Sequence, residues 1–296
     1  LMCTYGVKAR NPGCFCEKCE EGFRLYLGRR PESIWKRHGI TSLADFNYRN
    51  FVISKRVDPT QAPLWDEFVR FQVLSTAELL RDLCGRARSA TQRPLFIGAN
   101  QSPVSWYAIP LVNVFNYLAV ELSHNAPSLS ISDDGIIAYK MGDAVGIPVF
   151  STALGSDWRE IIAESHPWLV CAWIAQAYAL GHHMLLPVGA WSPNDRYRPT
   201  LDHYVCLAHW IKAIKHLLDG YEPVSYVALV ISMDVLRSGR DKDVFMKLCA
   251  QLSDRGIPYY VVLKGDIISE RTISAKDFKE VLIVMIPFPQ YISPEE

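Results

Sequence analysis

The sequence predicts an α/β fold that is built from parallel βα units. Short apolar runs suited to buried strands alternate with amphipathic stretches that are long enough for helices. Polar residues follow several of these runs, and the carboxyl ends of parallel strands are where binding and catalytic groups gather. A break rich in turn residues at 219–223 precedes a second series of the same kind. We therefore expect two domains, residues 1–219 and residues 220–296.

The first domain is expected to begin with helices. Helices are predicted at 20–30 and 64–87, and the chain between them is irregular, with prolines and short helical pieces such as 42–51. In the longer helix, apolar side chains recur along one stripe from Trp65 to Leu83 at helical spacing. That stripe indicates a long helix with one buried face.

The βα units follow these helices. In the first domain, strands are expected at 94–100, 112–122, 147–153 and 183–187, and helices at 134–145, 166–180 and 201–217. In the second domain, strands are expected at 224–231, 258–262 and 279–286, with a helix at 241–255. The order of elements favours one parallel sheet in each domain.

Composition argues against two classes of partner. The chain has 296 residues, and 31 Lys and Arg balance 31 Asp and Glu, so no excess charge predicts nucleic-acid or membrane-surface binding. No apolar run reaches the ~18 residues of a membrane helix, and the first residues lack a signal-peptide pattern. Four single cysteines in apolar contexts are expected to be buried thiols, which favours a cytoplasmic setting: Cys84, Cys171, Cys206 and Cys249.

A cysteine run near the start is the most specific motif. Cys14, Cys16 and Cys19 form a C-x-C-x-x-C pattern after a Pro-Gly turn, and this spacing places several thiolates within reach of one soft cation such as zinc. The alternatives are three free thiols, or one disulfide with a thiol left over. The fourth ligand is either Cys3, eleven residues earlier, or a residue upstream of Leu1. A closed four-ligand site would be structural.

The same stretch carries a family resemblance. Residues 14–27 read CFCEKCEEGFRLYL and resemble the C-[YF]-C-x-x-C-x-x-x-F-R-x-[WY]-L pattern of family 42 glycoside hydrolases of the β-galactosidase type, with weaker echoes along most of the chain. The resemblance implies that residues 1–219 are the second half of a (β/α)8 TIM barrel, since only four βα units are present. It also implies a flavodoxin-like domain at 220–296, a structural zinc, and a homo-oligomer such as a trimer.

The resemblance further implies hydrolysis of an O-glycosidic bond in a β-galactoside or related carbohydrate. The two family glutamates are missing, because Thr4-Tyr5-Gly6 and 151–154 stand at their places. Glu121, at the end of an apolar strand, and Asp157, in a turn after another strand, are the carboxylates that we expect to replace them. The structural alternatives are an ion pair for Glu121 and a helix cap for Asp157. A non-catalytic carbohydrate-binding or assembly protein is the alternative function.

Four further residues are candidates for substrate binding. Trp158 and Trp191 follow strand ends, where aromatic rings can stack on sugar rings, although core packing is the common role of tryptophan. Asn100 ends a strand and could hydrogen-bond a sugar hydroxyl, or simply shape a turn. His124 follows the strand of Glu121 near the expected barrel mouth.

Overall fold

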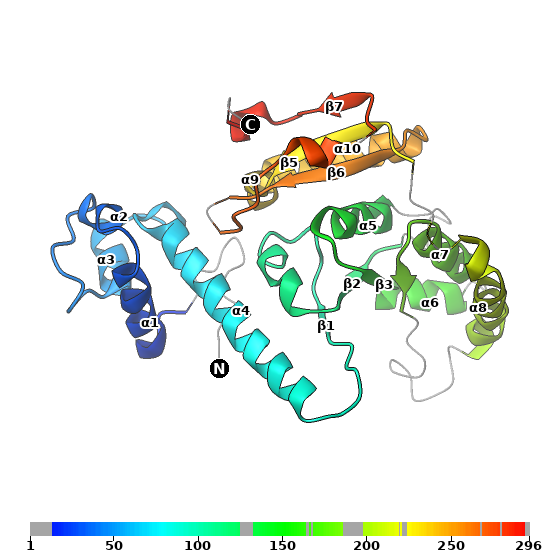
Figure 1. The fold of residues 1–296 in the computed structure, drawn as a ribbon, viewed down its shortest axis with the longest axis horizontal. Helices are drawn as coiled ribbons and strands as arrows, with labels where there is room; N and C mark the ends of the chain where they lie inside the picture. Colours follow the sequence, from blue (N-terminus) through cyan, green and yellow to red (C-terminus); the bar gives the residue numbers. More distant parts are fainter. Residues whose placement is uncertain are drawn as a thin grey trace. The chain divides into compact units, whose positions relative to one another are not determined.

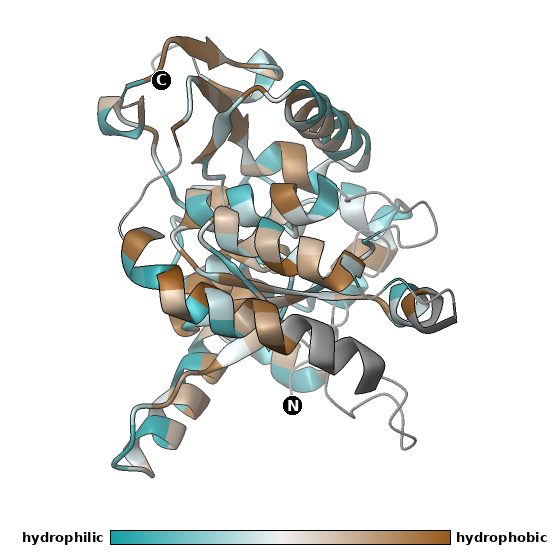
Figure 2. Ribbon diagram, turned by 90° about the vertical axis from the view of Figure 1, so that its right-hand side faces the viewer, coloured by the Kyte–Doolittle hydropathy of each residue, from teal (hydrophilic) through white to brown (hydrophobic). Residues whose placement is uncertain are grey.

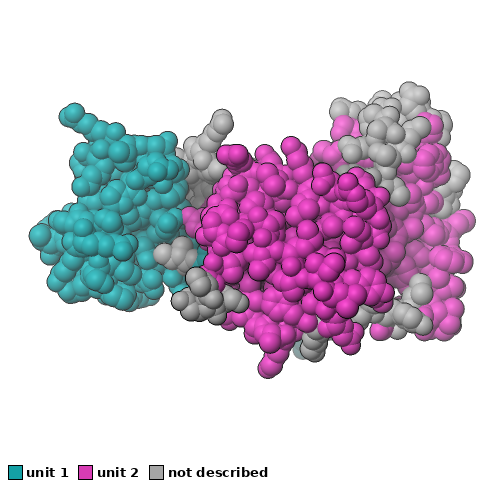
Figure 3. Space-filling model, turned by 90° about the horizontal axis from the view of Figure 1, so that it is seen from above, with its two compact units in different colours: residues 1–95, 265–270 teal, residues 96–264, 271–296 magenta. Residues whose placement is uncertain are grey.

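The computed structural model of this chain describes residues 14–124, 133–163, 166, 168–185, 198–218, 220, 224–266, 268–278 and 280–293. Two compact units make up the chain: residues 1–95 with 265–270, and residues 96–264 with 271–296 (Figure 3). Unit 1 is helical, and unit 2 is a mixed α/β unit with two parallel sheets. The predicted α/β class is therefore confirmed, whereas the compact units divide the chain elsewhere than the predicted boundary at 219/220.

Unit 1 packs its helices around aromatic rings. Its helices are α1 (Glu17–Gly28), α2 (Ser33–Lys36), α3 (Tyr48–Lys55) and α4 (Trp65–Ser89), with the short 3-10 helix η2 (Pro59–Gln61) before α4. The first and the last of these match the predicted helices within three residues at each end. The core uses only the first turns of the apolar stripe on α4, so Leu79 and Leu83 at its other end are exposed.

Phe23 of α1 lies at the centre of this aromatic core. Its exposed fraction is 0%, and its ring lies 5.0–6.0 Å, between centroids, from the rings of Tyr26, Tyr48, Phe68 and Phe71. We expect Phe23→Ala to lower the free energy of unfolding by about 3–5 kcal/mol, because it removes a buried ring and leaves a cavity. Urea unfolding of the two proteins measures the difference.

Phe96→Ala is the matched control for this substitution. Phe96 is 79% exposed, so the same chemical change removes little packing there. We expect it to change the free energy of unfolding by less than about 0.5 kcal/mol. Similar losses in the two variants would contradict the central place of Phe23 in the core.

Two buried carboxylates tie the helices of unit 1 together. Glu20 of α1 accepts hydrogen bonds from the backbone N–H groups of Tyr48, at 2.7 Å, and Arg49, at 3.1 Å, and so caps the start of α3. Glu67 of α4 accepts from the Tyr26 hydroxyl at 2.5 Å and from the Arg30 guanidinium at 3.3 Å. Both carboxylates are therefore buried with partners, which offsets the cost of removing them from water.

Unit 2 contains a four-stranded parallel sheet with the strands in chain order (Figure 1). Its strands are β1 (Gly98–Asn100), β2 (Tyr117–Leu122), β3 (Val149–Ala153) and β4 (His183–Met184). The helices between and after them are η3 (Ile109–Val114), α5 (Asp133–Val145), α6 (Gly155–Ala163), α7 (Trp168–Ala179) and α8 (Arg198–Leu218). Of these, α5, α7 and α8 follow the prediction. Within the described chain none of the helices is long and apolar enough to cross a membrane.

Two kinds of expectation for this part of unit 2 need correction, one about a strand and one about cysteines. The strand predicted from residue 112 begins only at Tyr117, because residues from Ile109 to Val114 form the 3-10 helix η3, in whose first turn Pro110 fixes the backbone. Cys206, predicted to be buried, is exposed on α8, and Cys171 is half-buried. Cys84 and Cys249 are buried as expected, and all four are free thiols.

The second sheet of unit 2 has three parallel strands in the order β6-β5-β7. These are β5 (Val227–Ser232), β6 (Tyr259–Lys264) and β7 (Ile283–Met285), with helices α9 (Met233–Arg237) and α10 (Gly239–Asp254) between the first two. The 3-10 helices η5 (Ala275–Phe278) and η6 (Pro289–Tyr291) flank β7. Every residue of the central strand β5 is buried, and the strands are among the hydrophobic segments of Figure 2.

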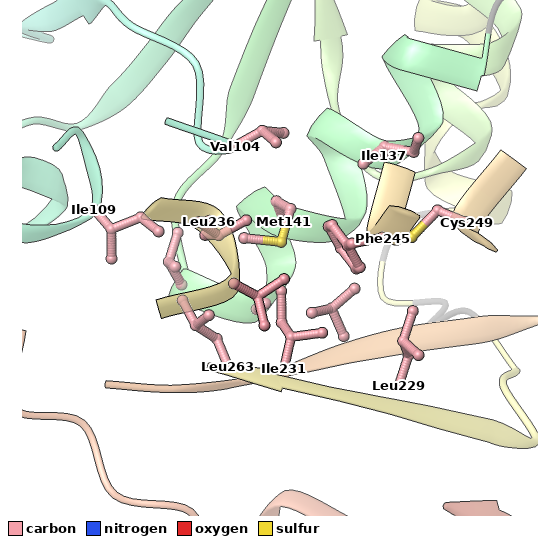
Figure 4. Close-up of a cluster of buried hydrophobic side chains, with 14 of the residues drawn as sticks. Val104, Ile109, Ile137, Met141, Leu229, Ile231, Leu236, Phe245, Cys249 and Leu263 are labelled. Atoms are coloured by element: carbon pink, nitrogen blue, oxygen red, sulfur yellow. The ribbon is translucent and has the colours of Figure 1, made fainter. Parts of the chain in front are cut away.

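One hydrophobic core serves both sheets. Ile137 and Met141 of α5 belong to one buried cluster with Leu229 and Ile231 of β5 and Phe245 of α10 (Figure 4). The same cluster includes Leu118 of the four-stranded sheet. Because this core contains residues from both sides of position 219, the two sheets belong to one compact unit.

Candidate active site and cysteine cluster

One face of the four-stranded sheet carries the exposed candidate residues. Along β2, Leu118 and Val120 are buried, whereas Tyr117 and Ala119 are half-buried and Glu121 is exposed. This alternation follows from the two-residue period of a strand, which sends successive side chains to opposite faces. The carboxylate of Glu121 therefore lies on the less buried face, at the carboxyl end of its strand.

Asn100 and Glu121 meet at the ends of β1 and β2. The Asn100 side-chain amide donates a hydrogen bond from Nδ2 to Oε1 of Glu121 at 2.9 Å. The structure thus brings together two residues that the sequence singled out separately. The amide thus fixes the position of one carboxylate oxygen of Glu121. The hydrogen bond therefore restricts the orientation of the Glu121 side chain.

An aromatic strip crosses the same face of the sheet. The ring of Phe150 lies 4.7 Å from the ring of Tyr117 and 4.5 Å from that of His183, between centroids. Gly98 lies under Tyr117, since a Cβ atom at this glycine would lie 2.3 Å from the Tyr117 ring. Burial, and secondarily the neighbouring His182, lowers the pKa of His183, which favours its neutral form. This strip was missed in the sequence, although the period-two alternation in β2 and β3 signals it.

Three other predicted site residues gather in a buried group instead. His124, Asp157 and Trp158 are at most 2% exposed, and they lie with Trp173 of α7. The centroid of the His124 ring is 4.6 Å from that of the Trp173 ring. The Trp158 ring contacts the same Trp173 ring edge-on, with the centroids 6.0 Å apart. In this conformation the three side chains do not share the exposed face with Glu121. The predicted substrate contacts of His124 and Trp158 do not fit this burial.

The Asp157 carboxylate hydrogen-bonds to the backbone of two loops. Its Oδ2 accepts a hydrogen bond from the backbone N–H of His124 at 3.0 Å and from that of Leu154 at 3.3 Å. Leu154 directly precedes α6, so the carboxylate of the third helical residue reaches back to the cap position. Asp157 is therefore not the N-cap that the sequence suggested for residues 158–163: it lies inside α6, which starts at Gly155, and caps this helix from its third position. Asp157 thus links the loop after β2 to the loop after β3.

We expect Asp157→Ala to lower the free energy of unfolding by about 1.5–3 kcal/mol, because two backbone donors, one of them buried, lose a charged acceptor. Asp45→Ala is the control, since Asp45 is exposed and should tolerate the change. Chemical unfolding followed by fluorescence measures both. If Asp157→Ala lowered the free energy of unfolding no more than Asp45→Ala does, the hydrogen bonds of this carboxylate would not stabilise the two loops.

The cysteine run forms a cluster at the start of α1. The three sulfur atoms of Cys14, Cys16 and Cys19 all lie within 4.8 Å of one another, and all three residues are free thiols. Cys16 is the N-cap residue of α1 and is exposed, whereas Cys14 and Cys19 are half-buried. These three residues can hold a metal ion.

The surrounding core fixes the geometry of this cluster. Phe15, between the first two cysteines, stacks on Phe68 with the ring centroids 4.9 Å apart. The buried Gln72 donates from Nε2 to the backbone oxygen of Cys14 at 3.4 Å. Burial, and then hydrogen bonds with Cys16 and Cys14, raises the pKa of the Cys19 thiol to about 12. A bound cation would have to displace that proton, as metal ions do at thiol ligands.

Two predicted residues lie outside the described part of the chain: Trp191, a candidate for sugar stacking, and Cys3, a candidate fourth ligand.

Comparison with protein families, curated proteins and solved structures finds no match for this chain. The functional argument therefore rests on the residues and their geometry.

Proposed function

We propose that the protein is a glycoside hydrolase that cleaves O-glycosidic bonds of a β-galactoside or related carbohydrate. The observation that carries the proposal is the exposed carboxylate of Glu121 at the carboxyl end of a parallel strand, oriented by the Asn100 amide at 2.9 Å. Glycosidases use carboxylates placed in this way to protonate or attack the scissile bond. Glu121 is one catalytic carboxylate in this proposal, and Asn100 sets its direction.

The proposed architecture is the second half of a (β/α)8 barrel followed by a flavodoxin-like domain. Sequential order of parallel strands, as in β1-β2-β3-β4, is the order of neighbours in such a barrel, and chemistry lies at the carboxyl ends of its strands. The aromatic strip beside Glu121 suits a barrel interior, which is filled by side chains. The order β6-β5-β7 equals the first three strands of the flavodoxin order 2-1-3. A homo-oligomer such as a trimer belongs to the same proposal.

A panel of aryl β-glycosides tests this function. The wild-type protein is expected to release the aryl leaving group from at least one glycoside, most readily from a β-galactoside or a close relative. The same sugars are screened in parallel for binding by calorimetry. Absence of turnover across the panel, with or without binding, would overturn the hydrolase proposal.

A non-catalytic carbohydrate-binding or assembly protein is the second candidate. The observation in its favour is Asp157, the other expected catalytic carboxylate, which is 2% exposed and accepts two backbone hydrogen bonds. A buried acceptor committed to loop structure is a poor partner for Glu121 in bond cleavage. Sugar binding without turnover in the same panel favours this second candidate.

We further propose that Cys14, Cys16 and Cys19 hold a structural zinc ion with Cys3 as the fourth ligand. In a tetrahedral zinc–thiolate site with Zn–S bonds of about 2.3 Å, neighbouring sulfur atoms lie about 3.8 Å apart. The separations of up to 4.8 Å in the cluster need only a small closure to reach that value. Four thiolates would leave no open position, so the ion would stabilise the fold and take no part in turnover.

A further inference from the structure

A buried amide lies beside the cysteine cluster of unit 1. It belongs to Gln72, which lies in the first half of α4 and is 1% exposed. Glutamine is mostly found at protein surfaces, and taking its amide out of water costs free energy unless hydrogen bonds replace those made with water. The partners of this amide therefore indicate why a glutamine is placed here.

Two hydrogen bonds connect this amide to the cluster. Nε2 of Gln72 donates to the backbone oxygen of Cys14 at 3.4 Å. The same side chain hydrogen-bonds to the sulfur of Cys19. An amide nitrogen carries two N–H groups, so it can serve both acceptors at once. One residue of α4 thus connects the first and the third cysteine of the cluster.

The bond to Cys19 favours the form of this side chain that binds metal ions. Burial, above all, raises the pKa of the Cys19 thiol, whereas the hydrogen bond with Gln72 lowers it. A contact that lowers the pKa stabilises the thiolate, and a thiolate can only accept, so the amide is the donor. Metal ions bind cysteine as the thiolate. The amide of Gln72 therefore opposes the cost of placing a negative sulfur atom at a half-buried position.

Helix α4 holds this amide in place independently of the chain that carries the cysteines. Phe68, one turn before Gln72, stacks on Phe15 with the ring centroids 4.9 Å apart. Thr76, one turn after it, donates from Oγ1 to the backbone oxygen of Gln72 at 2.7 Å. Residues in the middle of a packed helix have little freedom to move, so the donor is already in position before an ion binds.

We propose that Gln72 is a positioning residue of the zinc site formed by Cys14, Cys16 and Cys19, where its amide holds the backbone of Cys14 and donates to the Cys19 sulfur that binds the ion. The inference rests on the proposed zinc site and assigns to it a residue 53 positions after Cys19. Several thiolates around one Zn²⁺ carry excess negative charge, which an N–H donor reduces. Removal of such a partner of a metal ligand typically weakens metal binding by about 10–100-fold.

Competition with a chromophoric chelator under reducing conditions measures the zinc dissociation constant of the full chain. Gln72→Leu removes both N–H donors and is expected to raise this constant by about 10–100-fold. Thr76→Val is the matched control, since it also removes a buried hydrogen bond from α4, but one that goes to the helix backbone. It should keep the zinc affinity of the wild-type protein.

The absorption spectrum of the cobalt-substituted protein separates a direct effect on sulfur from a loss of packing. The energy of the sulfur-to-cobalt charge-transfer band depends on the electron density at the thiolates. Loss of the N–H donor in Gln72→Leu is expected to shift this band to longer wavelength, and Thr76→Val should leave it in place. Gln72→Met keeps the length of the side chain without its donors, so it supplies the same test if Gln72→Leu does not fold.

The measurements on the wild-type protein and on the variants distinguish two kinds of failure. If the wild-type protein binds zinc, an unchanged dissociation constant in Gln72→Leu, or weaker binding with an unchanged cobalt spectrum, would overturn the role of Gln72 alone. If the wild-type protein binds no zinc, the zinc site itself is wrong, and the role of Gln72 in it is overturned with it.

Discussion

Glu121→Gln is expected to reduce glycoside turnover by about 10²–10⁴-fold, the range that one acid–base group contributes to catalysis. Glutamine has the same size and keeps an oxygen that can accept the Asn100 hydrogen bond, but it cannot ionise. Because the side chain is exposed on the sheet face, the thermal midpoint should stay nearly unchanged. Initial rates on the best aryl glycoside and a thermal melt of both proteins measure the two expectations.

Glu78→Gln is the matched control for this prediction. Glu78 is an exposed glutamate on α4, and the same substitution there should leave the rate unchanged. Equal rates for the wild-type protein and Glu121→Gln would remove Glu121 from the catalytic role. A large fall in the thermal midpoint of Glu121→Gln would instead assign this carboxylate to the stability of the fold.

Removal of zinc is expected to have the largest effect on stability. A ligand that binds only the folded state stabilises it by about 4 kcal/mol when its free concentration is 1,000 times its dissociation constant. Chelation should therefore lower the thermal midpoint markedly, and added zinc should restore it. Atomic spectroscopy of the purified protein is expected to find one zinc per chain.

Cys16→Ser should abolish this zinc binding, and Cys206→Ser should not. Cys206 is an exposed free thiol on α8, outside the cluster, and so controls for the loss of one thiol. The loss of zinc from Cys16→Ser should destabilise the rest of unit 1 as well. Phe15 stacks in the aromatic core of this unit, and Glu20, next to Cys19, caps α3. Zinc content that is the same in Cys16→Ser as in the wild-type protein would show that the cluster is not the metal site.

Local patterns in the sequence were enough to predict most elements of the fold. The helix predicted at 64–87 is observed at Trp65–Ser89, and the strand predicted at 147–153 is observed at Val149–Ala153. Periodicity is a property of residues that are close in the sequence, so it can be recognised without knowledge of the tertiary structure. The cysteine cluster was predictable for the same reason, since C-x-C-x-x-C keeps its three thiols close in any compact turn.

Exposure at the candidate site was not predictable, because it depends on residues far apart in the chain. Glu121 lies at the end of an apolar strand and Asp157 follows another, yet Asp157 accepts a hydrogen bond from the backbone of His124, whereas Glu121 is exposed beside Asn100. The sequence by itself determined the α/β class, the order of its elements and the cysteine cluster. Only the tertiary structure decided which polar side chains lie on the open face of the sheet and which are buried under its helices, because packing between distant segments sets the solvent exposure of each.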